Sequence, residues 1–305
     1  MNIIADHLKE LFEDKIIEDF RKYIELNESS SCYVILSDYA LNNKDKTNDV
    51  VSYSIVTCEE LEYLSNKVKK TAKKDIKNTR SINPEFIKLL NRKTLFHINF
   101  LLGERKIFSK KGELSKDKMI ESIQLSLNEL SSSKRKDVQE RKIKLQALES
   151  EISKKSSNLK LITEIIIISF LTAYIMFLLT KEANVTEIAW MSDRDKITEA
   201  YNQTVFTMCQ QNHYALCVRN NVSTSKLKNM YYFPTEDGIF FTELVRIPDY
   251  IAGTLSDWNK LSPEVSKEKF VPILREVISD NNFCKLFNLS FSEGKMRCNE
   301  FKLHS

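Results

Sequence analysis

The stretch TEIIIISFLTAYIMFLLTKE, residues 163–182, decides whether this chain is anchored in a membrane or folded around a buried helix. Its apolar part, from Ile165 to Thr180, is shorter than the roughly 20 apolar residues that a helix needs to cross a bilayer. A helix that is hydrophobic on every side also occurs in the core of a large domain. We therefore predict a buried central helix, and we keep a single membrane span as the less favoured alternative.

The composition is that of a folded chain without a strong overall charge. Of the 305 residues, 42% are hydrophobic and 29% are charged, which is too apolar for a disordered chain. The net charge of +4 argues against a uniformly basic coat for nucleic acid, although local basic clusters remain possible partners of phosphate. None of the 5 glycines falls in a G-x-G-x-x-G or G-x-x-x-x-G-K pattern, so Rossmann and P-loop phosphate sites are not expected.

The cysteines indicate a reducing compartment. All six are dispersed without a C-x-x-C pair, and the acids in MNIIADHLKELFEDK interrupt the apolar core that a signal peptide needs. We therefore predict a cytoplasmic protein. Cys209, His213 and Cys217 recur at four-residue spacing on one predicted helix face and raise the question of zinc. No fourth ligand is visible, so packing in the core is the favoured interpretation.

Strands and helices alternate on both sides of the buried helix. An amphipathic pattern predicts an N-terminal helix within residues 1–30. SCYVILSDYAL and VVSYSIVT predict a hairpin of two strands, and a third strand follows around Leu95 to Leu101. A polar helical segment then leads into the buried helix, after which TEIAWMS predicts a fourth strand. Beyond it we expect a helix, one or two strands around NMYYFP, and a helix that begins near Pro248.

The order of these elements, together with two short blocks, resembles a known superfamily. WMSDRDKI (190–197) and LVRIPDYIAGTL (244–255) are similar to the W-x-S/T-D-x-D and P-D-x-x-A-G blocks of an uncharacterised bacterial family on the ribonuclease H-like fold. The resemblance covers residues 31–258, with a helical insertion at about 109–158. It implies an α/β (mixed α+β) fold with a five-stranded sheet and flanking helices. Residues 259–305 are then a C-terminal helical extension.

The resemblance also implies a set of acidic site residues. They are Asp38 on the first strand, Glu164 at the start of the buried helix, Asp193 after the fourth strand and Asp249 in the late helix, with Asp195 as a further metal ligand. Nucleases of this fold hold two Mg²⁺ or Mn²⁺ ions, which assist the attacking water and the leaving oxygen. Hard divalent cations prefer carboxylate oxygens, which explains why several acids are required.

Each acid also has a purely structural interpretation. Asp193 and Asp195 can end a strand and cap the next helix, and Asp249 can be an ordinary acid of a first helical turn. Asp38 is harder to explain in this way, because aspartate is depleted in strands. SDYALNN also departs from the Asp-Glu-Ser-Gly with which many relatives begin, so a non-catalytic binding module remains an alternative.

Two further segments are candidate contacts for partners. A run of lysines follows the hairpin and is either a solvated face or a contact to the phosphates of nucleic acid; its members are Lys67, Lys69, Lys70, Lys73, Lys74 and Lys77. In the helical insertion, Val138, Leu145, Leu148 and Ile152 form a heptad-like stripe, which predicts a helical hairpin or a short coiled-coil projection that could hold a protein partner or nucleic acid. A solvated helix on the protein surface is the alternative. The leading hypothesis is a metal-dependent nuclease acting on RNA, DNA or a hybrid, and the resemblance associates it with mobile or defence elements.

Overall fold

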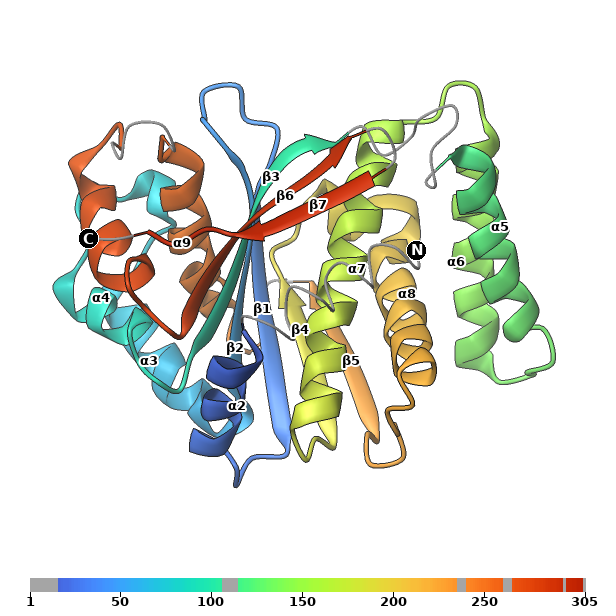
Figure 1. Ribbon diagram of the computed structural model, residues 1–305, viewed down its shortest axis with the longest axis horizontal. Coiled ribbons are helices and arrows are strands. Elements are labelled where there is room, and N and C mark those ends of the chain that lie inside the picture. The colour runs from blue at the N-terminus through green and yellow to red at the C-terminus, as the bar shows by residue number, and fades with distance from the viewer. Residues whose placement is uncertain (1–15, 106–114, 235–239, 260–264, 293–294, 304–305) are drawn as a thin grey trace.

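The computed structural model describes residues 16–105, 115–234, 240–259, 265–292 and 295–303, which form a mixed α/β structure around a seven-stranded sheet (Figure 1). The strands are β1 (Cys32–Ala40), β2 (Asp49–Thr57), β3 (Phe96–Arg105), β4 (Glu187–Ser192), β5 (Asn229–Pro234), β6 (Cys284–Ser292) and β7 (Lys295–Glu300). Their order across the sheet is β5-β4-β1-β2-β3-β6-β7. The β1, β4 and β5 strands are parallel, β1, β2 and β3 are successive antiparallel neighbours, β6 is parallel to β3, and β7 is antiparallel to β6.

The prediction of a five-stranded sheet is wrong, because β6 and β7 extend the sheet beyond β3. Both strands lie in residues 259–305, which we expected to be a helical extension. Helical turns occur in the first part of this segment, in η4 (Glu268–Phe270) and η5 (Ile273–Ile278). Leu289 and Phe291 are buried at alternating positions of β6, which is a strand signal. The pairing of β6 with β3 joins residues far apart in the sequence, such as His97 and Cys284, so no local sequence pattern reveals it.

Helices cover both faces of the sheet (Figure 1). One face carries α2 (Ile17–Leu26), α7 (Leu159–Glu182) and α8 (Lys196–Arg219), and the other carries α3 (Leu61–Thr71), α4 (Pro84–Leu90) and α9 (Arg246–Asp257). Side chains alternate along β1, so Tyr33 and Ile35 join the core under α7, whereas Val34 and Leu36 join the core under α9. Of the predicted N-terminal helix, residues 1–15 lie outside the described residues.

The apolar stretch at residues 163–182 lies in α7. This helix has 24 residues and is long and apolar enough to cross a membrane by length and composition, so our argument from a short apolar run is wrong. Its burial argues differently, because 94% of its most apolar window is buried inside the molecule. Such burial is expected of a core helix, whereas a membrane span exposes its apolar side chains to lipid. The α7 helix is thus consistent with the core of a soluble protein.

The segment between β3 and α7 forms two helices, α5 (Lys116–Glu129) and α6 (Lys136–Ser153), which lie outside α8 (Figure 1). The predicted stripe of Val138, Leu145, Leu148 and Ile152 is the buried side of α6. The α6 helix packs on α8, so the stripe contributes to the core of the molecule. The outer surface of this hairpin still exposes Leu125 and Ile143.

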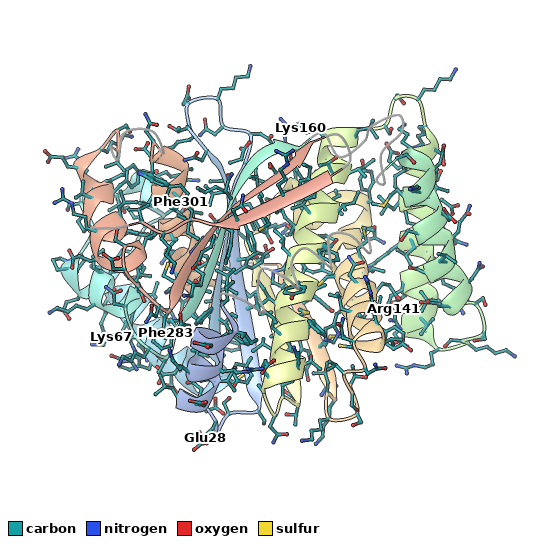
Figure 2. All side chains as sticks on the ribbon, viewed as in Figure 1. Glu28, Lys67, Arg141, Lys160, Phe283 and Phe301 are labelled. Atoms are coloured by element: carbon teal, nitrogen blue, oxygen red, sulfur yellow. A yellow bond between two sulfur atoms is a disulfide. The ribbon has the colours of Figure 1, made fainter. Side chains whose placement is uncertain are left out.

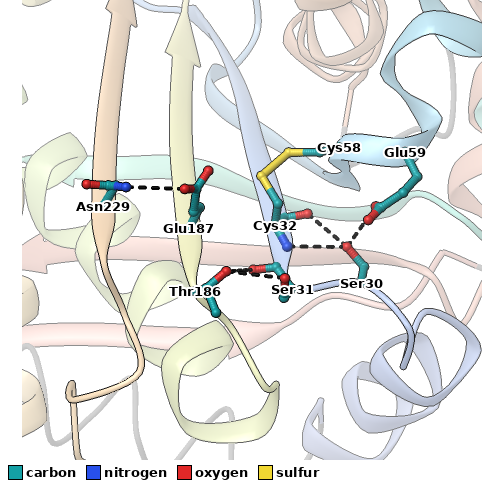
Figure 3. The surroundings of a disulfide bond; sticks show 8 residues. All are labelled: Ser30, Ser31, Cys32, Cys58, Glu59, Thr186, Glu187 and Asn229. Carbon is teal, nitrogen blue, oxygen red and sulfur yellow. Dashed lines mark hydrogen bonds between the residues drawn. A yellow bond between two sulfur atoms is a disulfide. The ribbon is translucent and has the colours of Figure 1, made fainter.

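Cys32 and Cys58 form a disulfide between the start of β1 and the residue after β2 (Figure 3). The antiparallel register pairs Tyr33 with Thr57, which brings the two cysteine Cα atoms to 5.5 Å, within the range that a disulfide spans. The sequence suggested dispersed thiols in a reducing compartment, and for this pair that expectation is wrong. The other described cysteines, Cys209, Cys217, Cys284 and Cys298, are free.

Candidate active site at the carboxyl ends of β1 and β4

Two of the predicted acids lie side by side because of the register of two parallel strands. Ser37 of β1 pairs with Ser192 of β4, so the next residues, Asp38 and Asp193, are neighbours at the carboxyl ends of these strands. The backbone N–H of Asp193 donates to the carbonyl of Ser37 at 3.4 Å, which continues the pairing past the end of β4. Both aspartates line a cavity of about 750 Å³ on the α9 side of the sheet.

A third predicted acid reaches the same cavity from α9. Asp249 lies in the first turn of this helix, where a carboxylate interacts favourably with the helix dipole. Its Oδ2 accepts the backbone N–H of Ile76 at 2.9 Å. This bond ties α9 to the turn η2 (Ile76–Asn78). We call the hollow that Asp38, Asp193 and Asp249 line the acid cavity.

Burial and nearby negative charges raise the pKa values of Asp38 and Asp249. Burial is the largest cause of the raised pKa of Asp38, and the negative charges of Asp249 and Asp193 raise it further. Burial also raises the pKa of Asp249 to about 6, with smaller contributions from the charges of Asp75 and Asp193. Like charges in a partly buried site are unfavourable without a counter-charge. The raised pKa values thus place Asp38 and Asp249 in a partly buried hollow where negative charges lie near one another.

Asp195, which we predicted as a further metal ligand, caps α8. Its Oδ1 accepts the backbone N–H groups of Ile197 and Thr198, both at 2.8 Å, and the Thr198 hydroxyl accepts the N–H of Asp195 at 2.9 Å. This reciprocal arrangement is a capping box, which satisfies backbone donors that the first helical turn leaves free. Asp195 is absent from the lining of the acid cavity, so the structural interpretation describes it better.

Glu164 lies apart from the other three acids. It belongs to α7, which covers the opposite face of the sheet, and only 6% of its surface is exposed. Its Oε1 accepts the side-chain amide N–H of Asn42 at 2.7 Å. The residues on either side of Asn42, Leu41 and Asn43, both line the acid cavity, so Glu164 approaches the rim of this cavity from behind β1.

A hydrogen-bond network behind the acids joins the ends of β1 and β4. The indole N–H of Trp190 donates to the Ser37 hydroxyl at 2.8 Å. The Tyr39 hydroxyl lies 2.8 Å from the Ser37 hydroxyl and accepts the Ser192 hydroxyl at 3.0 Å. Burial raises the pKa of Tyr39 well above its ordinary value, so its hydroxyl keeps its proton. The tryptophan and serine of the W-x-S-D block thus fix the two strand ends that carry Asp38 and Asp193.

Basic side chains share the acid cavity with the carboxylates. They are Lys46, Lys77, Arg194, Arg246, Lys267 and Lys269. Three of them are held in place: Lys46 pairs with Asp257 at 2.8 Å, Arg246 donates to the Ala72 carbonyl at 3.2 Å, and Lys269 donates to the Ile76 carbonyl at 2.6 Å. Apart from Lys77, sequence reasoning missed this set. Of these six residues, Arg194 and Arg246 lie inside the two sequence blocks at 190–197 and 244–255. Their positions beside the predicted acids could have identified them.

The predicted run of lysines does not act as one surface. Lys67 lies over the ring of Tyr63, 5.7 Å from its centroid, and Figure 2 shows it beside α3 on the side of the sheet opposite to Arg141 of α6. The Lys69 ammonium group pairs with the Glu243 carboxylate at 3.1 Å, which partly neutralises its positive charge. Lys77 lines the acid cavity, whereas Lys70, Lys73 and Lys74 line a separate cavity beside it.

The acids of the cavity have the ligand atoms that a divalent cation prefers, but the described side chains are not arranged as a metal site. Carboxylate oxygens are the ligands that Mg²⁺ and Mn²⁺ prefer, and Asp38, Asp193 and Asp249 supply them. Within the described ranges, however, no three His, Cys, Asp or Glu side chains are close enough to hold a metal ion. The same finding applies to the zinc alternative. His213 is buried in the core, with its Nε2 at 2.9 Å from the Thr180 hydroxyl and 3.4 Å from the sulfur of Cys217.

His97 is a second buried histidine with a structural role. Its Nδ1 lies 2.8 Å from the Ser54 hydroxyl and its Nε2 2.9 Å from the Leu90 carbonyl, which satisfies both ring nitrogens. Burial lowers its pKa to about 4, so the ring is neutral near pH 7. His97 is therefore a packed residue of β3.

Comparisons with models of protein families, with curated proteins and with solved structures find no match to this chain. The resemblance to the ribonuclease H-like superfamily therefore stays a prediction from the two sequence blocks. What the structure adds is a mixed α/β fold and the convergence of three of the predicted acids on one cavity.

Proposed function

We propose that this chain is a metal-dependent nuclease of the ribonuclease H-like type, acting on RNA, DNA or a hybrid. One observation carries the proposal: Asp38, Asp193 and Asp249, which are far apart in sequence, line one cavity at the carboxyl ends of two neighbouring parallel strands. The chain order of three antiparallel strands, a buried helix, a strand, a helix and a further parallel strand supports the same fold type.

The residues divide the work of phosphodiester hydrolysis between them. Asp38, Asp193 and Asp249 would hold Mg²⁺ or Mn²⁺ through carboxylate oxygens. Such ions, when bound, assist an attacking water and the leaving oxygen in an in-line displacement at phosphorus. Lys77 and Lys267 are exposed at the mouth of the cavity, where their charge favours the approach of a phosphodiester. Glu164 is proposed as a fourth acid that reaches the rim of the cavity.

The test is cleavage of labelled single-stranded RNA, single-stranded DNA and a hybrid by the purified protein in Mg²⁺ or Mn²⁺. We expect the wild type to cleave at least one of them, and Asp193→Asn to cleave it at least about a hundredfold more slowly, because a ligand oxygen is lost. Glu164→Gln distinguishes a set of three acids from a set of four. Equal activity of the wild type and the Asp193→Asn variant would show that catalysis does not occur at this site.

A binding module without catalysis is the second candidate. Two observations favour it: SDYALNN lacks the second acid and the small residues of its relatives, and Glu164 faces Asn42 on the far side of β1. This candidate predicts no metal uptake in isothermal titration with Mn²⁺. It also predicts nucleic-acid or protein binding that survives Asp38→Asn and is lost when exposed lysines of the helical insertion, Lys118, Lys134, Lys136 and Lys155, are replaced with glutamine. A cytoplasmic location belongs to both candidates as a proposal.

A further inference from the structure

A second cavity of about 790 Å³ lies beside the acid cavity, and its charge is of one sign. Its charged lining residues are Lys70, Lys73, Lys74 and Arg80, and no aspartate or glutamate lines it. The rest of the lining is mostly polar and includes Thr71, Asn78, Thr79, Ser81 and Asn83. We call this hollow the basic groove. It differs from the acid cavity, where acids and bases occur together.

The four cations of the basic groove lack anionic partners within the described part of the chain. No ion pair joins any of them to a described carboxylate, whereas Lys69, which precedes Lys70 on α3, pairs with Glu243. All four side chains are exposed, so their positive charges remain available to a ligand. Four neighbouring cations repel one another, and a polyanion would relieve that repulsion. The hydroxyl and amide groups between them are further hydrogen-bond donors for phosphate oxygens.

A firmly held ridge separates the basic groove from the acid cavity. Asp75, Ile76 and Lys77 line the acid cavity, and the next residues, Asn78 and Thr79, line the groove. The α9 helix holds this ridge at two successive positions. Asp249 accepts the Ile76 N–H on the cavity side, and the Tyr250 hydroxyl donates to the Lys74 carbonyl at 2.8 Å on the groove side.

Close packing fixes the ridge further. A Cβ atom on Gly253 would lie only 2.5 Å from the Cγ2 atom of Ile76, so α9 approaches the ridge as closely as a glycine allows. Lys269 donates to the carbonyls of Ile76 and Thr79, at 2.6 and 2.7 Å, and so clamps both ends of the ridge. The two hollows therefore keep a fixed separation, as expected of two subsites for one extended ligand.

We infer that the basic groove is a phosphate-binding subsite for a single-stranded nucleic acid whose scissile phosphate lies in the acid cavity. The inference rests on the proposed nuclease function for the role of the acid cavity. A single strand can bend over the ridge and place successive phosphates in both hollows. A duplex has a persistence length of about 150 base pairs and does not follow such a short, sharp path. The groove then selects single-stranded over double-stranded substrates.

The test is fluorescence anisotropy with labelled 20-nucleotide single strands of RNA and DNA, in EDTA so that cleavage cannot occur. The groove variant replaces Lys70, Lys73, Lys74 and Arg80 with glutamine. A matched variant replaces four exposed lysines of or near the helical insertion, namely Lys118, Lys134, Lys136 and Lys155. We expect the groove variant to bind at least tenfold more weakly and to lose roughly 2 to 3 units of salt slope, since each phosphate contact contributes about 0.7.

A control variant and a duplex ligand complete the test. The matched insertion variant should keep wild-type affinity, and a duplex of the same sequence should bind at least tenfold more weakly than the single strand. The inference is overturned by groove-variant affinity within twofold of the wild type, by loss of affinity only in the insertion variant, or by equal affinity for duplex. The single substitution Lys73→Gln, with a smaller loss, guards against misfolding of the quadruple variant.

The two proposals fail separately in these measurements. Groove-dependent binding without metal-dependent cleavage would refute the nuclease and leave the groove in place. Cleavage that Asp193→Asn abolishes, but that the groove variant retains at wild-type rate and affinity, would refute the groove and leave the nuclease.

Discussion

The acid cavity and the basic groove lie on the same face of the sheet, yet the chain builds them in opposite ways. Residues 70–84 supply almost the whole groove, with Tyr250 as the exception. The acid cavity takes the three predicted aspartates from β1, from the end of β4 and from α9, which are separated by long stretches of sequence. Charge for binding can thus be arranged locally, whereas a carboxylate cluster requires the tertiary fold. Substitutions in the two hollows should therefore have separable effects.

The largest difference between the effects on cleavage and on binding is expected from Asp38→Asn, which keeps the shape of the side chain and removes its charge. Metal-dependent cleavage should fall at least about a hundredfold, because the variant loses a carboxylate ligand of the reacting centre. Affinity for a single-stranded oligonucleotide in EDTA should not fall below that of the wild type, because the substitution removes a negative charge from the cavity that receives the scissile phosphate. Initial rates and anisotropy on the same preparations measure the two quantities. An equal loss of binding and cleavage would mean that the hollows do not act separately.

Asp249→Asn tests the electrostatic strain of the acid cavity through stability. The pKa of Asp249 is about 6 in the folded protein, above its ordinary value of 3.8, so the folded state holds its proton over a wider pH range. The stability of the wild type should therefore decrease as pH rises from about 4 to about 6 and stay lower above this window. Asparagine cannot ionise and still accepts the Ile76 N–H.

We expect Asp249→Asn to be more stable than the wild type in EDTA at pH 7.5, by up to about 3 kcal/mol, and close to it at pH 4. Urea denaturation at the two pH values measures the difference. Adding Mg²⁺ or Mn²⁺ should stabilise the wild type more than the variant. A variant that is less stable than the wild type at pH 7.5 in EDTA would contradict the crowding of these carboxylates.

Gly253→Ala tests the ridge that keeps the two hollows apart. Alanine favours a helix by about 1 kcal/mol over glycine, but here its Cβ would meet the Cγ2 atom of Ile76. We expect a net destabilisation of about 1 to 2 kcal/mol and weaker binding of single strands, because the ridge must move. A double-mutant cycle with Ile76→Ala is the control. The two substitutions should be less than additive, and full additivity would show that the contact does not limit α9.

Tyr39→Phe should have the smallest effect. It removes the hydroxyl that the Ser192 side chain donates to and leaves the Trp190 bond to Ser37 in place. We expect a loss of about 1 kcal/mol in stability and a severalfold weaker apparent affinity for Mn²⁺, with groove binding unchanged. Tyr232→Phe on β5 is the matched control and should leave the metal affinity unchanged. If Tyr39→Phe changed only the binding of nucleic acid to the basic groove, Tyr39 would not support the acid cavity as we propose.

Several features were predictable because they depend on local patterns. The first four strands, the buried helix and the start of α9 lie close to where period-two alternation, uniform hydrophobicity and Pro248 suggested. Asp38 was singled out because an acid inside a strand is unusual, and it does line the cavity. The helix cap at Asp195 was likewise predicted as a structural alternative, from its position between the end of a strand and the start of a helix.

Other features depended on contacts between distant segments. The β6 and β7 strands pair with the sheet through β3, the Cys32–Cys58 disulfide follows from the register of β1 and β2, and Glu164 is directed away from the other acids by the face that α7 covers. The lysine run was visible in the sequence, but its division between a ring contact, an ion pair and two hollows was not.

The sequence by itself determined which segments are apolar, which turns are charged and which acids are out of place, because these properties belong to single residues and their near neighbours. Only the tertiary structure decided that three of the acids line one cavity and that four cations share a separate groove. The physical reason is that charges act over a few ångströms in space, and those distances are set by strand register and by the packing of α9 on the ridge.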